Sequence, residues 1–269
     1  MLVQNVVALF GYNNTRLYDV QKIKSMLEKD FNARLLLIKE GITAEDLAVT
    51  PFCFDHKPED PEIGPVLASF LEESNLKLLG CLPFSDKGVI GAAFASKYFG
   101  LFGDDSDSSP AMLDKSLFRK LEASIDLPSE SYKKPFFSIA KNEADLFLTL
   151  KNSGPYFLKP TSEGNSRGCM KIEKPEDILV WLKDNKGNLE KIVICEEDLS
   201  HNKEYSFDGV AGHYWITEKF TTTGPYKAEY QQVVPAPFSD EVNLKTTTTL
   251  TNVIQLLGDR HSIFPLQPT

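Results

Sequence analysis

Residues 156–172 read YFLKPTSEGNSRGCMKI, and this stretch predicts a strand that ends in a lysine, a polar loop with two glycines, and a second strand. Gly164 and Gly168 allow the backbone to approach a ligand closely, and consecutive N–H groups in such a loop can bind an anion. Lys159 and Arg167 add positive charge. The combination suits a polyphosphate, although an ordinary glycine hairpin with surface lysines would have the same composition. No Gly-Lys-Ser/Thr sequence opens a helix here, so this is not a Walker loop.

Strand and helix patterns alternate along the first hundred residues. Apolar runs predict strands at 3–10, 35–38 and 77–81, and apolar spacings of three and four predict helices at 17–31, 61–73 and 86–98. Strands separated by helices imply a parallel sheet with right-handed crossovers. We therefore expect an α/β, Rossmann-like, doubly wound first domain.

The second half has a different pattern. Residues 100–110 are polar and turn-rich, which predicts a linker or surface loop, and a short helix carrying Leu117 and Leu121 follows. Beyond it we expect helices after Asn142 and from Pro175, strands at 156–159 and 192–195, an antiparallel pair at 205–210 and 213–220, and a last helix carrying residues 250–257. The Thr246–Thr249 run leaves the start of that helix open. The predicted domains are 1–112, α/β, and 113–269, α+β.

Composition and charge exclude several classes of protein. The chain has 269 residues, with 29 Lys and Arg against 38 Asp and Glu, so its formal net charge is −9. Such an acidic chain is not expected to bind nucleic acid or an anionic membrane with its whole surface. No apolar run approaches the ~20 residues of a membrane span, and the N-terminus lacks the basic start of a secretory signal. Four widely spaced cysteines favour reduced thiols and a cytoplasmic location: Cys53, Cys81, Cys169 and Cys195.

The glycine loop and its surroundings resemble the ATP-grasp family, and the loop is most similar to the D-alanine–D-alanine ligase branch. Residues 158–172 follow that family's order of strand, Lys-Pro, Ser, Glu-Gly, small hydroxyl residues and Gly. Four further segments match in order, namely Leu113-Asp114-Lys115, the hinge-like strand at 194–199, the Glu-x-Ser-x-Asp strand at 204–208, and the strand at 217–220 with the prolines that follow it. The resemblance covers roughly residues 81–264. It implies a pre-ATP-grasp α/β domain followed by an α+β ATP-grasp domain.

The resemblance implies that three groups of residues bind the phosphates of ATP. Lys115 and Lys159 would lie over the α- and β-phosphates, and Lys219 would reach the γ-phosphate or an acyl phosphate. The loop would close on the phosphates through Ser162, Gly164, Asn165, Ser166 and Gly168, with Arg167 nearby. Lys159, Arg167 and Lys219 are the predicted catalytic residues. Taken singly, each has an alternative as a surface residue, and Lys219 also fits an ion pair with Glu218 or Glu229.

The remaining nucleotide contacts would come from the hinge and the strand after it. In the hinge that contains Glu196, the main chain of Glu197 and Leu199 would contact adenine. Glu204 would accept hydrogen bonds from the ribose hydroxyls. Each of these carboxylates, taken alone, also fits a solvated strand edge.

The resemblance also implies Mg²⁺, but its ligands are not found in the sequence. Gln267 stands where the first metal carboxylate is expected, Pro265 replaces the usual His, and the chain ends before the family's Glu-x-Asn segment. We therefore expect an ATP-grasp domain that lacks its last strands, as a shortened protein, a fragment, or a chain completed by another subunit. No spacing supports any of the other acidic candidates, Asp208, Glu229, Asp240 and Asp259.

Two functions follow from this interpretation. The first is an ATP-dependent ligase that activates a small amino acid, peptide or other carboxylate as an acyl phosphate and transfers it to an amine or thiol. The alternative is a catalytically impaired, nucleotide-binding or partner-binding protein on the same scaffold. The expected partners are a small carboxylate and an amine acceptor, with neither nucleic acid nor membrane, and a homo-oligomer is left open.

Overall fold

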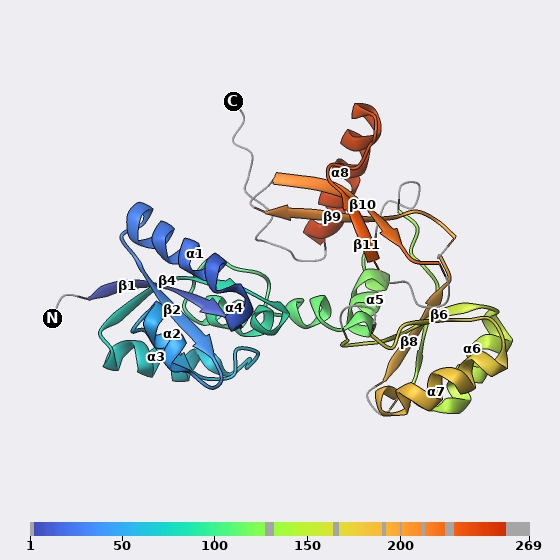
Figure 1. Cartoon of the computed structure of the whole chain (residues 1–269), viewed down its shortest axis with the longest axis horizontal. Coiled ribbons are helices and arrows are strands. Elements are labelled where there is room, and N and C mark those ends of the chain that lie inside the picture. Colours follow the sequence, from blue (N-terminus) through green and yellow to red (C-terminus); the bar gives the residue numbers. More distant parts are fainter. Residues whose placement is uncertain are drawn as a thin grey trace. The chain divides into compact units, whose positions relative to one another are not determined.

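The computed structural model describes residues 3–126, 132–163, 167–189, 192–199, 201–210, 213–223 and 229–256. The chain divides into two units, Met1–Pro110 and Ala111–Thr269 (Figure 1). Within the described ranges no helix combines the length and the apolar character needed to cross a lipid bilayer. All four cysteines are free thiols, as their spacing predicts.

The first unit contains a parallel four-stranded sheet, which confirms the expected α/β pattern. Its strand order is β3 (Cys53–Asp55), β2 (Arg34–Lys39), β1 (Gln4–Phe10) and β4 (Leu76–Pro83). Alternate residues of the central strands point to opposite faces. One face packs on α3 (Ile63–Glu73) and α4 (Val89–Tyr98), and the other on α1 (Leu17–Asp30) and α2 (Ala44–Val49). Among the described residues of this unit are two short 3₁₀ turns, at Asn14–Arg16 and Asp86–Gly88, and a third at Ser109–Met112 spans the boundary with the second unit.

Two glycines allow α4 to pack closely in this unit. A Cβ atom on Gly91 would lie 2.0 Å from the carbonyl oxygen of Pro58, and one on Gly88 would lie 2.3 Å from that of Phe10. Both distances are shorter than any van der Waals contact, so only glycine fits without a backbone shift.

The second unit begins with α5 (Lys115–Ser124) and an antiparallel sheet in the order β5 (Phe137–Ala140), β8 (Val193–Glu197), β6 (Tyr156–Pro160) and β7 (Met170–Ile172). The helices α6 (Glu143–Ser153) and α7 (Pro175–Leu189) pack on one face of it, around the fully buried Trp181. Asn142 caps α6 by accepting from the N–H of Asp145 at 3.1 Å, as its position predicts.

A second antiparallel sheet follows, in the order β11 (Glu229–Val233), β10 (His213–Thr221) and β9 (Glu204–Val210), and the predicted pairing of β9 with β10 is confirmed. The last helix, α8 (Asp240–Leu256), begins ten residues before the first residue of the apolar pattern and includes the threonine run. The hydroxyl of Thr248 donates to the carbonyl of Leu244 at 2.8 Å, which keeps this polar side chain within the helical hydrogen-bonding pattern. Val253 then packs α8 against α5.

Candidate functional site

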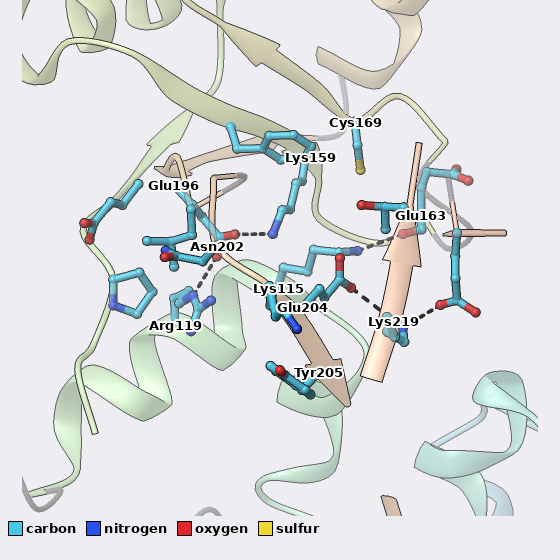
Figure 2. A pocket seen from close by; sticks show the side chains of 17 residues that line it. Lys115, Arg119, Lys159, Glu163, Cys169, Glu196, Asn202, Glu204, Tyr205 and Lys219 are labelled. Carbon is cyan, nitrogen blue, oxygen red and sulfur yellow. Dashed lines mark hydrogen bonds and ion pairs between the residues drawn. The ribbon is translucent and has the colours of Figure 1, made fainter. Parts of the chain in front are cut away.

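A cavity of about 760 Å³ lies in the second unit, between α5 and the strands of its two sheets (Figure 2). This volume is within the range of roughly 300–1,000 Å³ that is usual for small-molecule sites. The lining combines five cations, five carboxylates and several apolar side chains. These residues are Lys115, Arg119, Pro135, Phe157, Lys159, Glu163, Cys169, Glu196, Glu197, Leu199, Asn202, Lys203, Glu204, Tyr205, Lys219, Thr221 and Glu229.

The buried carboxylate of Glu196 joins two of the cations. Its Oε2 lies 2.6 Å from Lys159 Nζ and its Oε1 lies 2.6 Å from Arg119 Nε. Dashed lines mark both contacts in Figure 2. Glu196 is only 5% exposed. Burial alone would raise the pKa of this carboxyl, but the charges of Lys159 and Arg119 outweigh burial and lower the pKa below its usual value. The two cations are therefore held beside each other at the cavity wall.

Arg119 is a cavity residue that sequence reasoning missed. It lies four residues after Lys115, one helical turn further along α5, and this spacing places both side chains on the same face of the helix. The four-residue spacing from Lys115 is the sequence feature that could have identified Arg119 as a cavity residue. Together with Lys159 on β6 and Lys219 on β10, these residues bring positive charge to the cavity from three different elements.

Lys115 connects α5 to the start of the glycine loop. Its Nζ donates to the carbonyl of Glu163 at 2.7 Å and to that of Thr161 at 3.4 Å, and its backbone N–H donates to Thr161 at 3.0 Å. Asp114 caps the helix by accepting from the N–H groups of Ser116 and Leu117. The predicted Asp-Lys pair thus fixes where α5 begins and how it meets the loop.

Lys219 lies between two carboxylates on the other side of the cavity. Its Nζ is 2.9 Å from Glu229 Oε2 and 3.8 Å from Glu204 Oε1. The hydrogen bond to Glu229 is the main reason that the pKa of Lys219 is raised. Of the two ion pairs that the sequence allowed, the structure contains the one with Glu229, because Glu218 pairs with Lys203 at 2.7 Å.

The hinge residues line the cavity beside the apolar side chains of Pro135 and Phe157. The N–H of Glu197 donates to the carbonyl of Phe136 at 2.9 Å, and its side chain pairs with Lys133 at 2.8 Å. This hydrogen bond to Lys133 lowers the pKa of Glu197. Leu199 is largely exposed and lines the cavity two residues further along.

The predicted loop residues fall into two groups. Gly164, Asn165 and Ser166 lie outside the described residues. Of the others, Ser162 and Arg167 are exposed and do not line the cavity, and Arg167 lies 3.4 Å from Glu163. Gly168 has a positive φ of 69°, and its carbonyl accepts from the indole N–H of Trp181 at 2.7 Å, which anchors the end of the loop to α7.

Magnesium has no ready-made site in the described part of the chain, where no three His, Cys, Asp or Glu side chains gather in a way that could hold a metal ion. Mg²⁺ normally takes one or two carboxylates together with phosphate oxygens. A magnesium site in this part of the chain would therefore need phosphate oxygens of a bound nucleotide in addition to protein carboxylates. Asp259, Pro265 and Gln267 lie outside the described residues.

Comparison with solved structures shows extensive likeness at low sequence identity. No protein-family model and no curated protein matches the chain. An L-amino acid ligase from Bacillus licheniformis is 16% identical with a TM-score of 0.70, over 97% of this chain and 62% of that one. An N5-carboxyaminoimidazole ribonucleotide synthetase, solved as an ADP complex, is 12% identical with a TM-score of 0.66, over 96% and 64%. D-alanyl-alanine synthetase A from Vibrio cholerae is 13% identical with a TM-score of 0.59, over 97% and 83%. The chain thus spans less than two thirds of the first two proteins, and the likeness shows a shared fold.

Proposed function

We propose that the chain binds ATP in the cavity of the second unit and supports ATP-dependent joining of a small carboxylate to an amine or thiol. The chain has the fold of the ATP-grasp superfamily, and this fold supports the proposal. The observation that carries the proposal is the arrangement of Lys159, Arg119 and Lys219 around one cavity that also has an apolar side. In this proposal Met1–Pro110 corresponds to the pre-ATP-grasp domain and Ala111–Thr269 to ATP-grasp.

The cavity residues fit the parts of a nucleotide. Lys159 and Arg119, held together by Glu196, would bind the phosphates nearest the ribose, where two adjacent cations offset adjacent negative charges. Glu204 would accept from the ribose hydroxyls, and the base would lie against Phe157, beside the hinge with Glu197. Lys115 would contribute by holding the glycine loop in place as well as by its charge.

Lys219 is suited to the reacting end of such a ligand. ATP would transfer its γ-phosphoryl group to the carboxylate, which gives ADP and an acyl phosphate. The amine or thiol would then attack the acyl carbon, lose its proton and expel inorganic phosphate. A fixed cation such as Lys219 stabilises the negative charge that develops during transfer, because it needs no reorganisation at that moment. The carboxylates of Glu229 and Glu204 hold its ammonium in place beforehand.

The proposed substrate is a small amino acid or peptide. Support comes from the similarity of the glycine loop to the D-alanine–D-alanine ligase branch and from the names of the similar structures, which include an L-amino acid ligase and a D-alanyl-alanine synthetase.

Calorimetric titration with ADP and with ATP plus Mg²⁺ tests the binding site. We expect both nucleotides to bind, and Lys159→Ala to weaken ADP binding at least tenfold, because the variant removes one of the two cations on Glu196. Lys141→Ala is the matched control, since Lys141 is an exposed lysine of the same unit that does not line the cavity. No binding to the unsubstituted protein would refute the proposed function, and equal affinity in Lys159→Ala would refute this assignment of the cavity.

Phosphate release across a panel of amino acids and dipeptides tests turnover. Amino-acid-dependent release of phosphate from ATP is the expected result. Nucleotide binding without release for any member of the panel would favour the alternative, a nucleotide-binding protein on the same scaffold.

A further inference from the structure

A second buried carboxylate lies behind the cavity wall. Glu122, on α5, is 1% exposed and does not line the cavity. Leu121, its neighbour on the helix, and Ile125, the residue just after the helix, pack with Val253 of α8 in a small apolar cluster. A carboxylate is almost never buried to this extent unless it is paired, so its partners indicate what it does.

The partners of Glu122 are one cavity residue and one residue of the apolar cluster. Its Oε2 accepts from Arg119 Nη1 at 2.7 Å, and its Oε1 accepts from the hydroxyl of Tyr132 in a short hydrogen bond. The ring of Tyr132 packs in the same cluster as Val253, which limits where its hydroxyl can lie. Burial, and then the hydrogen bond to Glu122, raise the pKa of Tyr132 to about 12, so the phenol remains a donor at neutral pH.

Arg119 is consequently held at two points by two carboxylates. Its Nε donates to Glu196 at 2.6 Å and its Nη1 donates to Glu122 at 2.7 Å. A guanidinium is planar and has five N–H donors, so two contacts on different nitrogens fix its plane and leave donors for a ligand. Held by Glu196 alone, the side chain could rotate about that single contact.

We propose that Glu122, with Tyr132, is a positioning pair that holds Arg119 ready to bind a phosphate group of the nucleotide. This inference rests on the proposed function, because it takes the ligand of Arg119 to be a nucleotide phosphate. The order of contacts runs from the apolar cluster to Tyr132, Glu122 and Arg119, and the guanidinium then meets the cavity beside Lys159. A side chain that is already oriented loses less conformational entropy on binding, so preorganisation increases affinity for the phosphate without any direct contact from Glu122.

A double-mutant cycle with two ligands tests the inference. ADP and adenosine affinities are measured for the unsubstituted protein, Glu122→Gln, Arg119→Ala and the double variant. Glu122→Gln should weaken ADP binding about tenfold, corresponding to about 1.4 kcal/mol. It should change ADP affinity less than twofold when Arg119 is already alanine, and should leave adenosine affinity unchanged because adenosine has no phosphate. The inference would be overturned if Glu122→Gln reduced ADP affinity equally with Arg119 and with Arg119→Ala, or if it reduced adenosine affinity as much as ADP affinity.

Tyr132→Phe provides a milder second variant, which removes only the hydroxyl and keeps the ring in the apolar cluster. It should weaken ADP binding about threefold, again only when Arg119 is present. If circular dichroism shows that Glu122→Gln does not fold, Tyr132→Phe replaces it in the cycle. An ADP affinity unchanged in Tyr132→Phe would overturn the part assigned to the tyrosine. Failure of the unsubstituted protein to bind ADP would refute the proposed function itself, and this inference with it.

Discussion

Replacing Glu196 with glutamine removes the charge that holds Lys159 and Arg119 together while preserving the size of the side chain. In the unsubstituted protein each carboxylate oxygen of Glu196 accepts a hydrogen bond from one cation at 2.6 Å. In the variant one of these oxygens becomes an NH₂ group, which cannot accept a hydrogen bond and instead faces a donor. Lys159 would then lose its buried counter-charge, and Arg119 would keep only the charge of Glu122.

The expected cost is large because the pair is buried. Two unit charges 4 Å apart interact by about 4 kcal/mol at an effective dielectric of 20, and the desolvation of Glu196 offsets part of this gain. Removing one partner of a buried pair typically costs about 3–5 kcal/mol. We expect Glu196→Gln to lower the free energy of unfolding of the second unit by that amount at pH 7.

Urea denaturation followed by tryptophan fluorescence measures this loss in the second unit alone, because both tryptophans of the chain, Trp181 and Trp215, lie there. The control is Glu197→Gln on the same strand, whose carboxylate pairs with the exposed Lys133. Its effect should be much smaller, since solvent screens an exposed pair. If Glu196→Gln destabilised the unit no more than Glu197→Gln does, the reasoning would be refuted.

The same variant has a defined pH dependence. Because Lys159 and Arg119 outweigh burial, the pKa of Glu196 is lower in the folded protein than in the unfolded chain. Its stabilising contribution is therefore complete above the unfolded pKa of about 4.3 and is lost as pH falls through the folded value. The difference in stability between the unsubstituted protein and Glu196→Gln should shrink below about pH 4.3, and a constant difference down to pH 2 would contradict the assignment.

Three further predictions concern the framework of the two units. Gly91→Ala should destabilise the first unit by about 1–2 kcal/mol, because the new Cβ meets the carbonyl of Pro58 and overpacking outweighs the better helix propensity of alanine. Gly80→Ala, where a Cβ meets nothing within 4 Å, is its control in thermal circular dichroism, and equal melting temperatures for the two variants would contradict the argument. Asp114→Ala should lower the free energy of unfolding by about 1 kcal/mol, because α5 loses its N-terminal cap. Asp114→Asn keeps the side-chain acceptor and should retain most of that stability. Urea denaturation of the two variants distinguishes these outcomes. Burial raises the pKa of Cys195 to about 12, so iodoacetamide at pH 8 should modify this thiol only after unfolding. Mass spectrometry measures the modification, and rapid modification of the native protein would contradict the prediction.

The sequence was sufficient to predict the strands and helices that have strong apolar patterns. It predicts β1, α1, β2, α3, β4 and α4 in order, as well as the pairing of β9 with β10. It did not predict the short strands β3 and β5, which have three and four residues at sheet edges and are only half buried for most of their length. An edge strand of this length has too few residues for an alternating pattern, and its partner strand determines where it forms.

For the site, the motif identified Lys115, Lys159, Lys219 and the hinge, all of which line the cavity, and the family resemblance is confirmed at the level of the fold. Their roles toward a ligand stay predictions. Arg119 was missed because a single basic residue on an amphipathic helix is usually solvated. Glu122 was missed for a related reason, since nothing in the sequence shows that this glutamate is buried.

Apolar periodicity and local caps act over a few residues, so the sequence was enough to place the strands and helices that have strong patterns. The choice of which cation pairs with which carboxylate depended instead on the tertiary packing. Arg119 and Glu196 are separated by 77 residues, and they pair because α5 packs beside β8, where Glu196 is almost completely buried. Ion pairing depends on distance and burial, and both are set by packing between segments far apart in the chain.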